Sequence, residues 1–252
     1  MFNCDAIRRR KVTVRWMKEV RRGYSPKDHL EFGKSEKEKM KRAAEEIYYF
    51  LNRGYDIKSC TTYVGNHHLL SERQRLALLR SMVPGELLDE RMRKEIPQNT
   101  SMDKVYIDGF NTIITLEVAF SKCLLVQGMD TAIRDLAGLR GTYRIVDKTK
   151  MAIDGILNAL DRLKVREAVF YLDRPVSNSG RLKQYILQLS EEYNTGVQVE
   201  VINDVDRTLY DREGVITSDA VILDKSRSWY NLNRFIIQDS LPEAWIYDVF
   251  EN

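Results

Sequence analysis

The stretch VYIDGFNTI, residues 105–113, has the pattern of a buried strand that ends in a polar turn. Apolar residues lead to Asp108, Gly109 and Asn111, and apolar residues then resume. Glycine lets a chain turn tightly, and asparagine can hydrogen-bond the loop to itself. Asp108 is therefore either a turn residue that caps a helix or a metal ligand held at the end of a strand.

Beyond residue 100, short β-branched segments alternate with helical ones. This alternation predicts an α/β fold over residues 101–252, with a parallel, Rossmann-like sheet flanked by helices. The predicted strands are KVYID (104–108), AVFYLD (168–173), VQVEVI (197–202), GVITS (214–218) and RFIIQD (234–239). The predicted helices cover 112–122, 128–138, 148–163, 180–193 and 219–227.

Before residue 100 the periodicity predicts a small all-α module over residues 35–100, preceded by a basic segment, 1–34, with a short strand in IRRRKVTVRW. A Ser35–Glu38 capping box is expected to start the first helix of the module, and a Ser71–Gln74 box the third. The second helix is expected over 56–64, closed by Gly65, and the fourth over 86–95.

The composition is that of a globular chain, with 43% hydrophobic and 31% charged residues over 252 positions. Its apolar runs are too short to span a membrane, and the N-terminus lacks the apolar region of a secretory signal. Three cysteines, Cys4, Cys60 and Cys123, lie far apart without CxxC spacing. They predict reduced thiols in a cytoplasmic protein.

Charge is unevenly distributed along the chain. Residues 1–42 hold 14 Lys/Arg and 6 Asp/Glu, whereas the remaining 210 residues hold 26 and 31. A basic head on an acidic body favours an anionic partner such as nucleic acid, although a solvated, lysine-rich helix start would give the same pattern.

Several aspartates stand where predicted strands end. The carboxyl ends of parallel strands meet at one sheet edge, where ligands of such folds bind. Grouped carboxylates repel unless they are neutralised, and Mg²⁺ or Mn²⁺ neutralises them and can activate water. The alternative is that each is a helix N-cap. The candidates are Asp108, Asp173, Asp204, Asp206 and Asp219, of which all but Asp204 are predicted to be catalytic.

A second polar cluster follows Asp173, in LDRPVSNSGRLKQYI. Small polar residues at a helix start expose backbone N–H groups, which suit an anion. The predicted substrate contacts here are Ser177, Asn178, Ser179, Arg181 and Lys183, and Asn111 and Arg140 are predicted to join them. Arg134, Arg140 and Arg144 are either phosphate contacts or surface arginines, and Arg140 lies between two glycines on an expected tight loop.

Other chemistries are disfavoured in the sheet part of the chain. It has no GxxxxGK[ST] loop for a nucleotide and no GxGxxG after the first strand. The three histidines, His29, His67 and His68, all precede it, so a serine hydrolase triad is not expected. His67 and His68 are assigned to an interhelical turn in preference to a metal site.

YIDGFN resembles the opening motif of NYN domains, a branch of the PIN-like nuclease superfamily. VDRTL, with Asp206, and VITSDAVIL, with Asp219, are similar to the later motifs in order and spacing, so the resemblance covers residues 103–240. It implies a PIN-like fold, in which Asp108, Asp206 and Asp219 bind Mg²⁺ or Mn²⁺ and Asn111 orders the first loop. The implied activity is that of an endoribonuclease or related phosphodiesterase.

The whole chain also resembles a prokaryotic, notably archaeal, family catalogued only as a domain of unknown function. There LNRGY, LSERQR and DGFN recur with IRDLAGLRGTY and LDRPVSNSG.

Three alternatives to a ribonuclease stay open. Segment 217–222 has one aspartate where NYN domains often have two, which leaves room for a non-catalytic RNA- or ribosome-binding protein. Residues 56–82 have the pattern of a helix-turn-helix DNA-binding regulator, with SERQRLALLR as its recognition helix. A small-molecule phosphatase would use the same acids. The sequence does not determine the oligomeric state, and a homodimer is one of the options that it leaves open.

Overall fold

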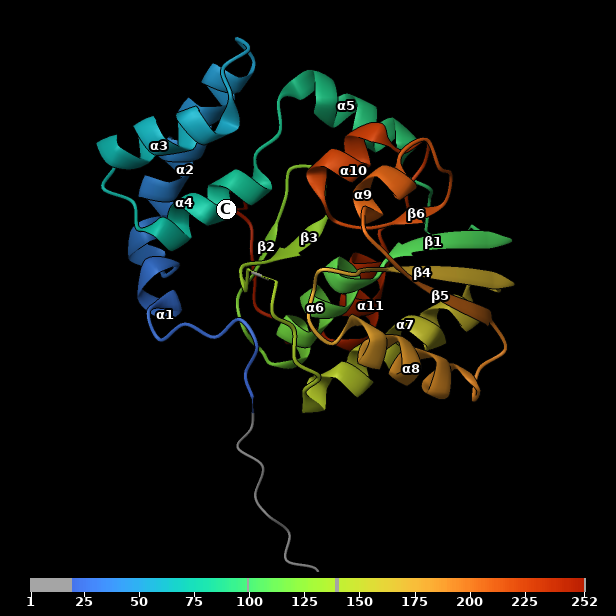
Figure 1. Ribbon diagram of the computed structural model, residues 1–252. Helices are drawn as coiled ribbons and strands as arrows, with labels where there is room; N and C mark the ends of the chain where they lie inside the picture. The colour runs from blue at the N-terminus through green and yellow to red at the C-terminus, as the bar shows by residue number, and fades with distance from the viewer. Residues whose placement is uncertain (1–19, 99, 139–140, 252) are drawn as a thin grey trace, which may run out of the picture.

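The computed structural model describes residues 20–98, 100–138 and 141–251 (Figure 1). Most of the basic segment, including Cys4 and the strand expected in IRRRKVTVRW, lies outside these residues. Among the helices described, none is both long and apolar enough to cross a membrane.

A parallel four-stranded sheet forms the centre of the α/β part. Its order is β5-β4-β1-β6, and every neighbouring pair is parallel. The strands are β1 (Lys104–Asp108), β4 (Glu167–Asp173), β5 (Gly196–Ile202) and β6 (Val215–Ile216). The predicted α/β class, with a helix-flanked parallel sheet after an N-terminal helical region, is confirmed at this level.

Helices cover both faces of this sheet (Figure 1). Because side chains alternate along a strand, Phe170 and Leu172 enter the core on one face, whereas Val169 and Tyr171 pack on the other. The first face is covered by α6 (Gly109–Phe120), α7 (Asp147–Arg162), α8 (Ser179–Ser190) and α11 (Leu232–Ser240). The second is covered by α9 (Val205–Leu209) and α10 (Ala220–Lys225).

The N-terminal region is helical and shares its core with a second, smaller sheet. Met40, Ile47 and Leu78 of the helices belong to one apolar cluster with Val126 and Tyr247. The helices are α1 (Asp28–Glu31), α2 (Lys34–Leu51), α3 (Ile57–His67), α4 (Glu72–Ser81) and α5 (Gly85–Lys94). The small sheet, ordered β3-β2-β7, contains β2 (Leu125–Gln127), β3 (Ile133–Asp135) and β7 (Ile246–Tyr247).

Two predicted elements are wrong. The helix expected over 128–138 is a hairpin between β2 and β3, closed by a Gly128 N–H to Ala132 O hydrogen bond of 2.9 Å. The strand expected over 234–239 lies in α11, which buries Leu232, Ile236 and Ile237 on one face. Ile236 lies four residues after Leu232, and Ile237 four after the buried Asn233, which is helical spacing, whereas the β-branched composition alone suggested a strand.

Helix ends were predicted with mixed success. The Ser71–Gln74 capping box is confirmed at the start of α4. The Ser35–Glu38 box is wrong, because α2 begins at Lys34 with Gly33 as its N-cap. Gly65 lies inside α3, where a Cβ atom would come within 2.8 Å of the Arg75 Nε atom. That glycine therefore makes room for a side chain of α4 and does not end the helix.

Candidate functional site

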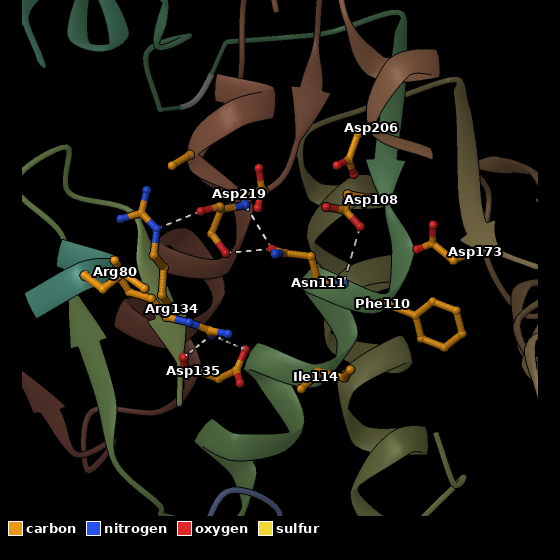
Figure 2. Close-up of a pocket in the computed structure, with 13 residues that line it drawn as sticks. Arg80, Asp108, Phe110, Asn111, Ile114, Arg134, Asp135, Asp173, Asp206 and Asp219 are labelled. Atoms are coloured by element: carbon orange, nitrogen blue, oxygen red, sulfur yellow. Dashed lines mark hydrogen bonds and ion pairs between the residues drawn. The ribbon is translucent and has the colours of Figure 1, made fainter. Parts of the chain in front are cut away.

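Four aspartates from four strand–helix junctions line one pocket of about 330 Å³ (Figure 2). Asp108 ends β1, Asp173 ends β4, Asp206 lies in the first turn of α9 after β5, and Asp219 follows β6. The structure thus brings together the four acids predicted to be catalytic. Their position at the carboxyl edge of a parallel sheet is where such folds bind ligands.

Burial and mutual repulsion disfavour charge on these acids. Asp108 is 6% exposed, and burial, followed by the charges of Asp219 and Asp173, raises its pKa to about 7. Burial and neighbouring acids also raise the pKa of Asp173 and of Asp206. Within the described ranges, no lysine or arginine forms an ion pair with any of the four. The acidic end of the pocket therefore lacks an internal counter-charge in that part of the chain.

Two of the acids also cap helices, as the alternative interpretation expected. Asp219 Oδ1 accepts hydrogen bonds from the N–H groups of Val221 (2.8 Å) and Ile222 (3.2 Å) at the start of α10. Asp108 Oδ1 accepts from Asn111 N at 3.4 Å. Each cap uses one carboxylate oxygen, and the second oxygen of Asp108 accepts from Thr217 Oγ1, so lone pairs of the second oxygen remain on both acids after capping.

Asn111 connects two of the loops that carry these acids. Its Oδ1 atom accepts hydrogen bonds from Ser218 N (3.0 Å) and Ser218 Oγ (2.6 Å), and Asp108 Oδ2 accepts from Thr217 Oγ1 (2.9 Å). The start of α6 is thereby tied to the segment after β6. Asn111 was expected to order its own loop, whereas its side-chain oxygen binds Ser218 of the neighbouring segment.

Two arginines, each ion-paired with an aspartate, line the other end of the pocket. Arg80, on α4, hydrogen-bonds the Asp135 carbonyl and lies 3.6 Å from Asp135 Oδ2. Arg134, on β3, donates from Nε to the Ser218 carbonyl at 2.7 Å. Figure 2 shows both arginines on the side away from Asp206 and Asp173. The pocket therefore has an acidic end and a basic end.

A buried ion network fixes the backbone on both sides of Asp219. Asp130 is fully buried and accepts from Arg134 Nη2 (2.6 Å) and Arg91 Nη1 (2.7 Å). Burial alone would raise the pKa of Asp130, but Arg134 and then Arg91 hold it below its usual value. Arg91 also donates to the Ala220 carbonyl at 3.2 Å, and Arg134 to that of Ser218. The two arginines thus hold the peptide carbonyls that flank the acid.

A family model described as Domain of unknown function (DUF5616) matches residues 97–235, more than half of the chain. The chain belongs to the DUF5616 family. A second model, Protein of unknown function (DUF434), matches residues 39–94. The uncharacterized protein MJ0935 of Methanocaldococcus jannaschii is 31% identical over 209 residues, which span 82% of this DUF5616 chain and 97% of the relative. No solved structure matches the chain.

Of the remaining predicted substrate contacts of this DUF5616 chain, those that the structure describes do not line the pocket. Ser177 and Asn178 instead bind the backbone of Tyr143: Ser177 Oγ accepts from its N–H at 3.0 Å, and Asn178 Nδ2 donates to its carbonyl at 2.6 Å. Ser179 is buried at the start of α8, on which Arg181 and Lys183 also lie. Arg140 lies outside the described residues. Contact of these residues with a substrate stays a prediction.

No local pattern in the sequence predicts that the helical region contributes to the DUF5616 pocket. Leu79 and Arg80 reach it from α4, which precedes β1 by more than twenty residues. Phe110 lines the pocket and packs edge-on against the buried Tyr143, with ring centroids 5.1 Å apart. Both aromatic rings belong to the core.

Proposed function

We propose that this chain is a Mg²⁺- or Mn²⁺-dependent ribonuclease, or a related phosphodiesterase, on a PIN-like fold. The observation that carries the proposal is the convergence of four aspartates on one pocket at the carboxyl edge of a parallel sheet. The resemblance of YIDGFN, VDRTL and VITSDAVIL to NYN motifs supports a nuclease among the enzymes that use such a site.

The donor set suits a hard divalent cation. Carboxylate oxygens are the protein ligands that Mg²⁺ and Mn²⁺ prefer. Burial, and then the charges of Asp219 and Asp173, raise the pKa of Asp108, and a bound cation would offset both effects. The described residues do not gather three of these carboxylates within 4.8 Å of one another. One or two carboxylates together with water, the usual arrangement for Mg²⁺, therefore fit better than a closed cage. Asp108, Asp206 and Asp219 are the proposed ligands, one or two of them bound directly and the rest through water.

The other pocket residues have separate roles in the proposed reaction. A bound Mg²⁺ or Mn²⁺ supplies an activated water and offsets charge at the phosphate. Asp173, whose raised pKa favours proton uptake, accepts the proton of the attacking water on its carboxylate. Arg80, with a side chain 32% exposed, binds a non-bridging phosphate oxygen at the basic end.

The proposed RNA substrate is supported by charge. The surplus of Lys/Arg over residues 1–42 favours a polyanion, and Arg181 and Lys183 on α8 add predicted backbone contacts. A cytoplasmic location belongs to the same proposal and is supported by Cys60 and Cys123, which are free and buried.

Cleavage of labelled single-stranded RNA in Mn²⁺ tests the enzyme. We expect wild-type cleavage that stops in EDTA and falls more than about 100-fold in Asp219→Asn, because loss of even an outer partner of a metal ligand costs roughly 10- to 100-fold. Asparagine keeps the N-cap of α10, so folding is preserved.

Asp204→Asn is the matched control for this test. Asp204 caps α9 by accepting from Arg207 N at 3.0 Å and lies near the same sheet edge, but it does not line the pocket. It should cleave as wild type does. Equal activity in wild type, Asp108→Asn and Asp219→Asn would show that the assigned site is wrong.

A non-catalytic RNA- or ribosome-binding protein is the second candidate. The observation that favours it is the capping role of Asp108 and Asp219, which gives both acids a structural purpose without a metal. It predicts salt-sensitive RNA binding that EDTA leaves unchanged, with no cleavage in Mn²⁺.

The DNA-binding regulator and the small-molecule phosphatase gain less support from the structure. The arginines of the proposed DNA recognition helix all bond within the protein: Arg73 to Asp28, Arg75 to the Leu70 carbonyl and Arg80 to that of Asp135. A small-molecule phosphatase would use the same acids, and hydrolysis of a monoester in preference to RNA would distinguish it.

A further inference from the structure

Glu46, His67 and His68 meet where α2 and α3 pack together, and none of them lines the acidic pocket. One potential ligand atom from each lies within 4.8 Å of the other two. His68 Nε2 is 3.0 Å from Glu46 Oε1, and the two imidazole rings stand edge to face with centroids 4.9 Å apart. We propose that these three side chains bind a zinc ion.

The chemistry of the three donors selects the metal. Imidazole nitrogen suits zinc, copper, nickel and iron. Two histidines with one glutamate form a known three-ligand set for zinc. With zinc–ligand bonds of about 2.0–2.2 Å, tetrahedral ligand atoms stand roughly 3.4 Å apart. The Glu46–His68 pair is already near that separation, so binding needs only side-chain rotation to bring in the exposed His67.

The local backbone explains why adjacent histidines can converge. His67 is the last residue of α3, and His68 is its C-cap. Glu46 reaches them from α2, and its ion-pair partner among the described residues is His68, not a lysine or arginine. No permanent cation of that part of the chain therefore has to be displaced.

A pocket of about 520 Å³ lies beside the cluster and includes Glu46 and His67 in its lining. Three protein ligands leave one tetrahedral position open, and this pocket gives water or an exchangeable donor access to it. The bound ion would also join α2 to α3, so it should stabilise the helical region by linkage.

Calorimetric titration of the full chain, stripped with EDTA, with zinc chloride tests the proposal. We expect one tight site in wild type. His67→Ala should lower the zinc affinity more than about 100-fold, because loss of even an outer partner of a metal ligand costs roughly 10- to 100-fold. Because His67 is exposed, metal-free His67→Ala should melt as wild type does. His68→Gln provides a second variant, read by the visible spectrum of bound Co²⁺, which reports tetrahedral coordination.

Two controls separate this site from other ligands of the chain. His29→Gln removes the third histidine, which stacks on Trp245, and Asp108→Asn alters the acidic pocket; both should bind zinc as wild type does. Absence of a thiolate charge-transfer band in the Co²⁺ complex excludes the cysteines. The proposal is overturned if wild type binds no zinc, or if His67→Ala and His68→Gln bind it unchanged. Either result leaves the proposed nuclease site untouched.

Discussion

At the scale of single residues, Asp108 combines a structural and an electrostatic role. It caps α6, accepts a hydrogen bond from Thr217, and is buried beside Asp219 and Asp173. Its pKa of about 7 lies well above the usual value of 3.8. The folded protein therefore binds a proton here more tightly than the unfolded chain does.

The stability of the metal-free protein should fall as pH rises because of Asp108. The contribution of its protonated form is fully present below the unfolded pKa near 4 and is lost as pH rises through about 7. Asp108→Asn removes this dependence. Urea unfolding in EDTA should show the variant more stable than wild type by on the order of 2–4 kcal/mol at pH 8, with the gap closing towards pH 4. A gap independent of pH would contradict the assignment.

The positions of the acids could be predicted from sequence, but their surroundings could not. Asp108 and Asp173 end strands, and strand ends of a parallel sheet share an edge. Arg80 and Arg134 reach the pocket only because α4 and the β2–β3 hairpin dock there, and no local pattern in the sequence encodes that docking.

At the scale of elements, the β2–β3 hairpin depends on one glycine. A Cβ atom on Gly128 would lie 2.1 Å from Arg134 Nη1 and 2.5 Å from Asp130 Oδ1. The turn therefore lets the guanidinium reach the carboxylate that it neutralises. Any side chain at this position would separate a buried ion pair.

Gly128→Ala should destabilise the protein by about 3–5 kcal/mol, the usual cost of breaking a buried ion pair. Gly180→Ala is the matched control, because a Cβ atom there meets no heavy atom within 4 Å, and it should be neutral or slightly stabilising. Chemical denaturation of both variants measures the difference, and equal stabilities would show that the network tolerates the shift.

Ser71→Ala should cost about 1 kcal/mol in the same measurement. Ser71 Oγ accepts from Gln74 N at 3.1 Å, and the Gln74 side chain accepts from Ser71 N at 3.0 Å. Ser35→Ala is the control, because Ser35 lies inside α2 and caps nothing. Equal losses in the two variants would contradict the capping assignment.

The helices and strands that were predicted correctly are those with a clear local pattern in the sequence. The short apolar runs of β1 and β4, the alternation of apolar and polar residues in β5, and the Ser71 box are local signals. The hairpin and α11 were missed because apolar, β-branched residues satisfy either geometry in a buried setting, and tertiary packing selects between them.

At the scale of the whole molecule, the helical region and the small sheet have one core. Leu124 is fully buried in the cluster that contains Met40 and Leu78, and Trp245 stacks on His29 with centroids 4.4 Å apart. Residues near both ends of the described chain therefore stabilise the same apolar cluster.

Leu124→Ala should destabilise the helical region and the sheet together, by about 2–5 kcal/mol. Because the core is shared, far-ultraviolet circular dichroism and tryptophan fluorescence should report a single coincident unfolding transition in wild type and variant. An early loss of helix signal, with fluorescence unchanged, would show instead that the two parts unfold independently.

The pocket also crosses the boundary between the two family matches. Arg80 and Arg91 lie within residues 39–94, whereas the four aspartates and Arg134 lie within residues 97–235. A gene that encoded only the second stretch would supply every acid but lose Arg80 and one of the two arginines that hold the carbonyls beside Asp219. The pocket as described is therefore complete only in a chain that carries both stretches.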